Sequence, residues 1–192
     1  MNKYESLFYN IETAWDCPPL TNEAIVLAEQ RLGHPLPAAY LDVLRVHNGG
    51  YLRRSIYPKR YLPYLHNYLH LPVLYGIGGE EGIDSNLTWH EDIPRCKYLA
   101  TQLGVDPIHV VVISRFGRFG LVLDYSKLRG SEPSLCFVYV GNSPEVNLEY
   151  IDESFASFID SLEVDSEIEC QFESIEQSPS ENGGGLQLMH TD

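Results

Sequence analysis

Residues 22–50 read NEAIVLAEQRLGHPLPAAYLDVLRVHNGG, and this stretch predicts two consecutive helices. In the first helix, Ile25, Ala28 and Leu32 recur at helical spacing and form one apolar face. A glycine ends this helix, and a Leu-Pro step introduces the second one. The second helix ends at Asn48-Gly49-Gly50, because these residues tolerate the left-handed conformation found at helix ends.

The segments on either side of this stretch differ in character. Upstream, apolar residues recur at helical spacing between Tyr4 and Trp15, which predicts an amphipathic helix over residues 2–15. Downstream, residues 51–75 contain six of the 13 tyrosines together with three prolines. This composition predicts a long structured loop or a short helix between strands.

The second half of the chain carries the strand pattern. Residues 108–113 are rich in β-branched side chains and predict a central strand, while residues 121–125 and 135–140 predict two more strands. Residues 153–162 return to helical spacing. Helices, then strands, then a helix, without βαβ alternation, predict an α+β fold. We expect a largely antiparallel or mixed sheet, flanked by N-terminal helices and a C-terminal helix.

Charge divides the chain into two parts. The formal net charge is −14, and residues 130–192 contain 14 acids and no Lys or Arg. We therefore expect a single domain over residues 1–162 and an acidic, mostly disordered tail over residues 163–192. The acidic total disfavours binding to nucleic acid or to an anionic membrane.

The sequence shows no sign of membrane insertion or export. No apolar run approaches the roughly 20 residues that a membrane span needs. The N-terminus lacks the apolar region and the cleavage site of a signal peptide. We therefore expect a cytoplasmic protein with no membrane partner.

The cysteines do not form a recognisable metal or redox motif. They lie far apart and include no Cys-x-x-Cys pair, so we expect four reduced thiols and neither a metal nor another cofactor. The four are Cys17, Cys96, Cys136 and Cys170.

The histidines are better explained by structural positions than by metal binding. His66 and His70 lie four residues apart, but two imidazoles alone make a weak metal site. We expect His34 in a turn, His47 at a helix C-terminus and His109 in a strand.

No catalytic motif is present. The chain has no phosphate-binding loop, no complete dinucleotide fingerprint and no nucleophile elbow. Glu80, Glu81 and Asp84 could serve as an acid–base pair, but we expect a solvated acidic turn there. No catalytic residue is expected, and an enzyme is the least supported class.

Several motifs, taken in order, resemble the SUKH superfamily. Together they cover about residues 21–162, whereas residues 51–72 and the tail after 163 have no counterpart. The motifs are Glu29-Gln30-Arg31-Leu32-Gly33, Leu36-Pro37-Ala38-Ala39-Tyr40, His47-Asn48-Gly49-Gly50, Gly76-Ile77-Gly78, the strand at 110–113 and Ser154-Phe155-Ala156-Ser157-Phe158-Ile159.

This resemblance implies an α+β domain without catalysis. The superfamily includes the yeast cell-wall-assembly regulator and many bacterial immunity proteins, which neutralise polymorphic or contact-dependent toxins. The leading hypothesis is an immunity protein that binds the C-terminal domain of one cognate toxin. An intracellular adaptor or regulatory scaffold is the alternative.

A partner-binding surface is predicted in the tyrosine-rich segment. Tyr and Arg are enriched at protein–protein hot spots, and the acid excess would steer association with a basic toxin. The same residue types could bind nucleic acid by stacking, a third hypothesis that the net charge opposes. The predicted contact residues are Tyr51, Arg53, Arg54, Tyr57, Lys59 and Arg60.

Overall fold

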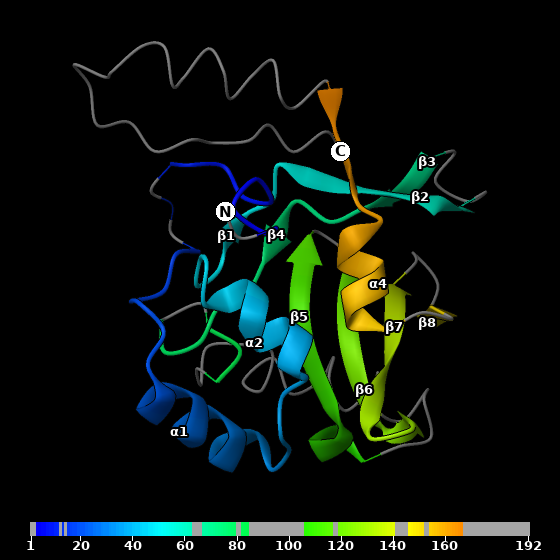
Figure 1. Cartoon of the computed structure of the whole chain (residues 1–192). Helices are drawn as coiled ribbons and strands as arrows, with labels where there is room; N and C mark the ends of the chain where they lie inside the picture. The colour runs from blue at the N-terminus through cyan, green and yellow to red at the C-terminus, as the bar shows by residue number, and fades with distance from the viewer. Residues whose placement is uncertain are drawn as a thin grey trace.

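The computed structural model describes residues 3–11, 13, 15–62, 67–79, 82–84, 106–116, 119–140, 146–151 and 154–166. Two helices come first, then strands, then a last helix and a short strand (Figure 1). The elements are α1 (Asn22–Leu32), α2 (Ala38–Leu44), β1 (Gly50–Tyr51), β2 (Arg54–Leu62), β3 (Asn67–His70), β4 (Val73–Leu74), the 3-10 helix η1 (Pro107–His109), β5 (Val110–Phe116), β6 (Phe119–Arg129), β7 (Glu132–Val140), β8 (Val146–Ile151), α4 (Phe155–Asp160) and β9 (Glu163–Val164).

The strands form three sheets, and every pairing between described strands is antiparallel. The largest sheet has the order β5-β6-β7-β8, and the smaller ones have the orders β3-β2-β9 and β1-β4. The α+β prediction is therefore confirmed.

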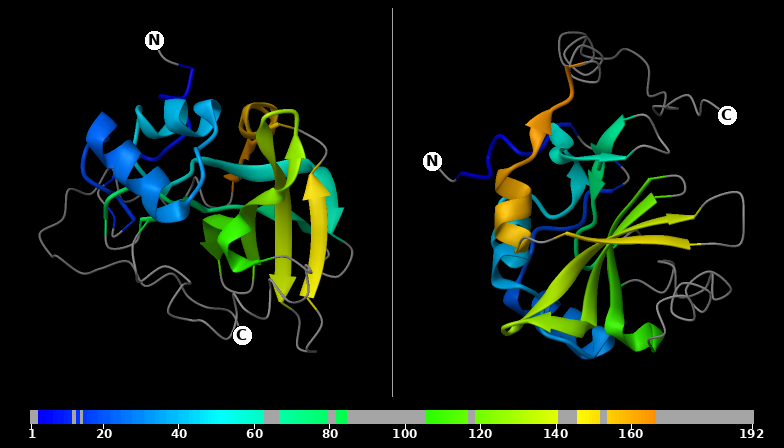
Figure 2. Two further views of the ribbon diagram at one scale, coloured as in Figure 1. Left: turned by 90° about the horizontal axis from the view of Figure 1, so that it is seen from below. Right: turned by 90° about the vertical axis from the view of Figure 1, so that its right-hand side faces the viewer.

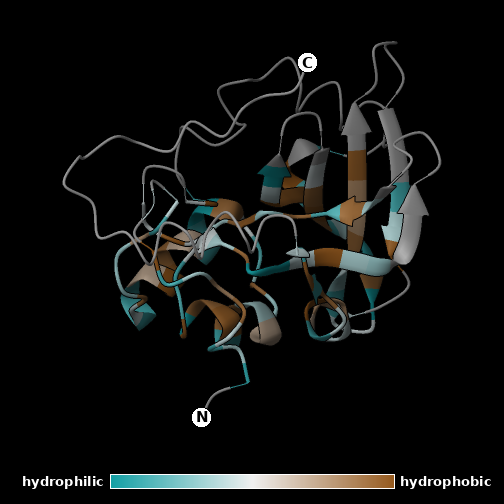
Figure 3. Ribbon diagram, turned by 90° about the horizontal axis from the view of Figure 1, so that it is seen from above, coloured by the Kyte–Doolittle hydropathy of each residue, from teal (hydrophilic) through white to brown (hydrophobic). Residues whose placement is uncertain are grey.

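The main core lies between the four-stranded sheet and the helices. Figures 1 and 2 show α2 and α4 on the same face of this sheet. Tyr40 of α2 meets Phe155 of α4 edge to face, with ring centroids 5.2 Å apart. The hydropathy colouring of Figure 3 places apolar stretches in the strands and alternates polar with apolar residues along the helices.

Both helices predicted within residues 22–50 are present, and α1 ends as expected. The second one, α2, already ends at Leu44, with Arg45 in the right-handed conformation, so its predicted end at Asn48-Gly49-Gly50 is wrong. The Thr21 hydroxyl oxygen accepts from the Ala24 N–H at 3.1 Å and caps α1. Gly33 ends α1 with a φ of 74°, in the left-handed region. Among the described residues, no helix is long and apolar enough to cross a membrane.

The predicted helix over residues 2–15 is wrong for the residues described there. Instead of a helix, the segment forms turns, and Phe8 makes an antiparallel bridge with Leu52. The Tyr9 N–H also donates to the Tyr51 carbonyl at 3.1 Å. Tyr4, Leu7 and Phe8 are still buried, so the apolar spacing marks core residues held by pairing with a distant strand.

The prediction of a loop or short helix over residues 51–75 is also wrong for the residues described there. These residues supply strands β1 to β4, of which β2 and β3 pair with each other. The register of that pairing shifts between Tyr57 and Tyr61. Pro58 lies within the shift, and a proline without an N–H is accommodated at such an irregularity.

The strand predicted as central lies at one end of its sheet. β5 pairs with β6 only on one side within the four-stranded sheet. On its other side, the Tyr75 N–H donates to the Ile113 carbonyl at 2.9 Å, and the Ser114 hydroxyl donates to the Val73 carbonyl at 2.5 Å. The segment that includes β4 therefore covers this edge of β5. This covering explains why β5 has the apolar sequence of a central strand.

The start of the predicted tail is ordered. Glu163 and Val164 form β9 and pair with β2, so the folded part extends past residue 162. The rest of the predicted tail, from residue 167, lies outside the described residues.

Candidate functional site

The turn after α2 fastens two distant segments together. The Asn48 side chain donates from Nδ2 to the Ile77 carbonyl at 2.9 Å and to the Pro18 carbonyl at 2.6 Å. Its Oδ1 accepts from the Ile77 N–H at 3.0 Å. Because Asn48 is buried, these bonds satisfy backbone groups that would otherwise lose water without a replacement.

The glycine after Asn48 allows this close approach. A Cβ on Gly49 would lie 2.5 Å from the Trp15 carbonyl oxygen and 2.7 Å from the Gly76 nitrogen, and its φ is 90°. No other residue type fits such a position without displacing backbone. The sequence Asn-Gly-Gly therefore joins the N-terminal segment, the end of α2 and the turn at residues 76–79.

Asp84 holds the other side of that turn. Its Oδ1 accepts from the Gly78 N–H at 2.7 Å, and its Oδ2 pairs with Arg31 of α1 at 3.2 Å. Its side chain is only 4% exposed. The prediction of a solvated acidic turn is thus wrong for Asp84, because a backbone donor and an arginine compensate its burial; Glu80 and Glu81 lie outside the described residues.

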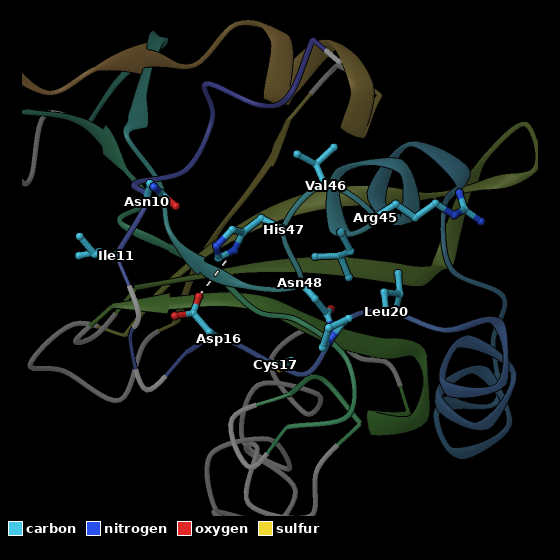
Figure 4. A pocket seen from close by; sticks show the side chains of 11 residues that line it. Asn10, Ile11, Asp16, Cys17, Leu20, Arg45, Val46, His47 and Asn48 are labelled. Carbon is cyan, nitrogen blue, oxygen red and sulfur yellow. Dashed lines mark ion pairs between the residues drawn. The ribbon is translucent and has the colours of Figure 1, made fainter. Parts of the chain in front are cut away.

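A pocket of about 470 Å³ opens beside the Asn48 turn (Figure 4). The N-terminal segment forms one side and the end of α2 with the following turn forms the other. Polar and apolar groups both face it, which is typical of sites that orient a ligand as well as bury it. The lining residues are Asn10, Ile11, Asp16, Cys17, Pro19, Leu20, Leu44, Arg45, Val46, His47 and Asn48.

Asp16 and His47 lie next to each other in this pocket. Oδ1 of Asp16 lies 3.6 Å from Nδ1 of His47 (Figure 4). Nδ1 also lies 2.5 Å from the Gly49 carbonyl oxygen, which can only accept, so Nδ1 carries a hydrogen and donates it there. The ring stacks on Phe8 at 4.9 Å, which fixes its plane.

Cys17 also lines this pocket, and its thiol is not activated as a nucleophile. Burial raises the pKa of its thiol, and hydrogen bonds from the backbone of Gly79 and Gly76 oppose this only in part. A nucleophilic cysteine needs the opposite shift, toward thiolate. Throughout the described part of the chain, no group of three or more His, Cys, Asp or Glu side chains is placed to hold a metal ion.

The predicted contact residues do not form a single exposed surface. Tyr57 is 5% exposed and packs on Phe158 with ring centroids 4.9 Å apart. Arg54 donates from Nε to the Leu162 carbonyl at 2.7 Å and from Nη2 to the Asp160 carbonyl at 2.8 Å. Both side chains therefore support the packing of α4.

The other four predicted residues vary in position. Tyr51 is half-buried in β1, and Arg53 is exposed between β1 and β2. Lys59 and Arg60 belong to β2, but their side chains lie outside what the structure describes. The role of these residues in binding stays a prediction.

Sequence reasoning missed the pocket pair. Asp16 and His47 are 31 residues apart, and each has an ordinary local role, one before the prolines and one after α2. No spacing rule links them. The Asn-Gly-Gly turn was the only local signal that this region is closely packed.

The comparisons with known proteins address the family. The model of the SMI1/KNR4 family (SUKH-1) matches residues 19–161, well over half of the chain. A comparison with curated proteins found no match, and neither did a comparison with solved structures. The family match includes both N-terminal helices, the Asn-Gly-Gly turn, strands β1 to β8 and α4, and it confirms the predicted SUKH resemblance. The chain therefore belongs to the SMI1/KNR4 family (SUKH-1).

Proposed function

We propose that this protein is an immunity protein, a non-catalytic domain that binds and neutralises the C-terminal domain of one cognate toxin. The observation that carries the proposal is the family match over residues 19–161. This match favours a binding domain of the SUKH type. Whether the domain acts in immunity or in regulation is decided by capture of its partner and by a growth-protection assay.

The chemistry of the pocket favours binding over catalysis. Burial raises the pKa of the Cys17 thiol, so the thiol stays protonated at neutral pH. The Nδ1 hydrogen of His47 is directed to the Gly49 carbonyl and not to a nucleophile. Asp16 and His47 are therefore better suited to recognise a polar group than to activate one.

The pocket is suited to receive one anchoring side chain of the partner. Protein interfaces gain most of their binding energy from a few side chains that fill pockets and lose their water. Leu20 and Val46 supply apolar wall, and Asp16 and His47 supply hydrogen-bonding groups. We expect the toxin to insert a long side chain with a polar end here.

The charge of the chain favours a basic partner. With a formal net charge of −14, the protein attracts cationic surfaces at long range. Such steering raises the association rate at low salt more than it raises the final affinity. A basic toxin, such as a nuclease, fits this charge.

The first step of the test is identification of the partner. The tagged full-length chain is used to capture proteins from its native host at moderate and at high salt, and mass spectrometry identifies them. The captured toxin domain is then expressed alone and together with this chain in bacterial cells. Growth arrest by the domain alone, relieved by the chain, is the expected result.

Two matched variants connect the result to the pocket. Asn10→Trp places a large ring at the pocket, whereas Asn22→Trp places the same ring on the exposed start of α1. We expect loss of protection with Asn10→Trp and full protection with Asn22→Trp. Several partners that are lost at high salt, none of them toxic, would overturn the immunity proposal and favour the regulatory scaffold.

A further inference from the structure

Two histidine rings meet where the connection after α1 approaches the start of β5, at the lower end of β5 in Figure 1. His34 follows the glycine that ends α1, and His109 is the last residue of η1. Nε2 of His34 and Nδ1 of His109 lie 3.3 Å apart. Both residues are half-buried, so the pair borders solvent.

Neighbouring groups fix the position of the His34 ring and of the His109 backbone. His34 stacks on Tyr125 with ring centroids 4.1 Å apart and an interplanar angle of 10°. The Tyr125 hydroxyl in turn donates to the Pro35 carbonyl at 2.7 Å. On the other side, the Asp106 carbonyl accepts from the His109 N–H at 2.9 Å. The stack on Tyr125 therefore holds the His34 ring, and the backbone bond holds the residue that carries the second ring.

At most one ring hydrogen can lie between the two nitrogens of this cluster. Nε2 of His34 also lies 3.0 Å from the Ile108 carbonyl oxygen. If Nε2 carries a hydrogen, that carbonyl and Nδ1 of His109 compete for it. If Nδ1 of His109 carries it instead, the carbonyl oxygen faces a lone pair of His34. A cation among the three atoms would interact favourably with all of them.

We propose that His34 and His109 bind a late first-row divalent transition metal ion, of which Zn²⁺ and Ni²⁺ are examples. Imidazole nitrogens are preferred ligands of these ions. In a tetrahedral site with Zn–N distances of about 2.0–2.1 Å, two ligand nitrogens lie about 3.3–3.4 Å apart. The two histidines already have this separation.

Water completes the coordination in this site. Within the described residues no third His, Cys, Asp or Glu side chain joins the pair. The Ile108 carbonyl can accept a hydrogen bond from a metal-bound water. A bound ion links the segment after α1 to the start of β5, so it stabilises the folded chain by an amount that grows with the logarithm of the free ion concentration above its Kd.

The test uses tag-free, full-length chain that has been stripped with EDTA and transferred to chelator-free buffer. Ni²⁺ is the probe, and its binding is measured by calorimetry and by the rise in melting temperature. His34→Gln and His109→Gln remove one ligand each. His70→Gln is the matched control, because His70 is a half-buried histidine that contacts Ser55 instead.

The expected result is one Ni²⁺ ion per chain in the unmodified protein and in His70→Gln. His34→Gln and His109→Gln should each weaken binding by about tenfold or more, since loss of an outer-shell partner alone costs 10–100-fold. Absence of binding in the unmodified protein overturns the proposal. Unchanged affinity in either ligand variant overturns it as well, because the ion would then bind elsewhere.

A second measurement avoids substitution altogether, because glutamine could disturb the stack on Tyr125. Paramagnetic Ni²⁺ broadens the NMR signals of the rings nearest to it. In the unmodified chain, the ring signals of His34 and His109 should broaden first as Ni²⁺ is added. Earlier broadening of any other histidine contradicts the site.

Discussion

Asn48 binds Ile77 through both ends of its side-chain amide, with Nδ2 donating to the carbonyl at 2.9 Å and Oδ1 accepting from the N–H at 3.0 Å. This arrangement mimics the way in which a neighbouring strand would satisfy the residue. It ties the turn after α2 to the turn at residues 76–79 across 29 positions of sequence. Of these two turns, the one after α2 lines the pocket beside it.

Replacement of Asn48 by alanine should destabilise the fold strongly. It leaves the buried N–H and carbonyl of Ile77 without partners, and each such group costs about 1–3 kcal/mol. We expect a loss of about 2–4 kcal/mol in the free energy of unfolding, measured by urea denaturation. Asn10→Ala, at an exposed asparagine, is the control and should change stability by less than about 0.5 kcal/mol. Equal effects of the two substitutions would contradict the assigned role of Asn48.

Substitution of Gly49 and of Gly130 allows the cost of steric overlap to be measured apart from the cost of backbone strain. Both have positive φ, 90° and 65°, but a Cβ on Gly130 meets nothing within 4 Å. Gly130→Ala should therefore cost about 1–2 kcal/mol from its left-handed conformation alone. Gly49→Ala should cost at least about 2 kcal/mol more, because its Cβ also overlaps backbone atoms. Thermal denaturation of both variants measures the difference, and similar losses would show that the close contact is unimportant.

His70 should make stability depend on pH. Burial lowers its pKa, and the nearby Asp165 carboxylate opposes this only in part. The unfolded chain, with an ordinary His pKa near 6.5, therefore takes up a proton at a higher pH than the folded chain. The stabilising effect is complete above about pH 6.5 and is lost as pH falls through the lowered folded pKa.

The variant His70→Gln isolates this contribution. Glutamine can still hydrogen-bond to the Ser55 hydroxyl, which lies 3.1 Å from Nε2 of His70, but it does not titrate. Urea midpoints measured at pH 7.5 and 5.5 should fall less for the variant than for the unmodified chain. Parallel pH profiles would rule out a contribution from His70.

Cys136 should be inert in the folded protein. It is 0% exposed in β7, and burial, aided by the Asp124 carboxylate, raises its pKa to about 12. Thiolate is the reactive form, so alkylation at pH 8 should leave Cys136 unmodified. Mass mapping after labelling with and without denaturant tests this. Modification of Cys136 under native conditions would show that this face of the sheet opens.

Arg54 should contribute to stability through the end of α4. Its guanidinium donates to the carbonyls of Asp160 and Leu162, and such bonds satisfy groups that a helix C-terminus leaves open. Arg54→Ala should lower the free energy of unfolding by about 1–3 kcal/mol. The control is Arg45→Ala, which removes only an exposed ion pair with Asp42 and should cost about 0–1 kcal/mol.

The expected role of Arg54 in stability also affects how the predicted interface is tested. A variant that removes Arg54 together with its basic neighbours would lose stability as well as any contact with a partner. Arg53→Ser alone is the cleaner probe of binding, because it leaves both bonds from Arg54 to the end of α4 in place. If Arg54→Ala is as stable as the unmodified chain, Arg54 is again a candidate contact residue for the partner.

The sequence by itself determined the fold class and some of the local elements. Thr21 and Gly33 specify the ends of α1, because a hydroxyl cap and a left-handed glycine act within a few residues. Alternation and β-branched residues likewise identified β5, β6 and β7. The ordered set of motifs was enough to indicate the family, which the match over residues 19–161 confirms.

Only the tertiary structure decided how distant segments meet. The apolar spacing of residues 4–11 is compatible with a helix, but pairing of Phe8 with Leu52 prevails there. Asp16 reaches His47, and His34 reaches His109, because the fold brings these turns together. Periodicity records which side chains are buried, whereas the partner of each one depends on contacts that no local pattern encodes.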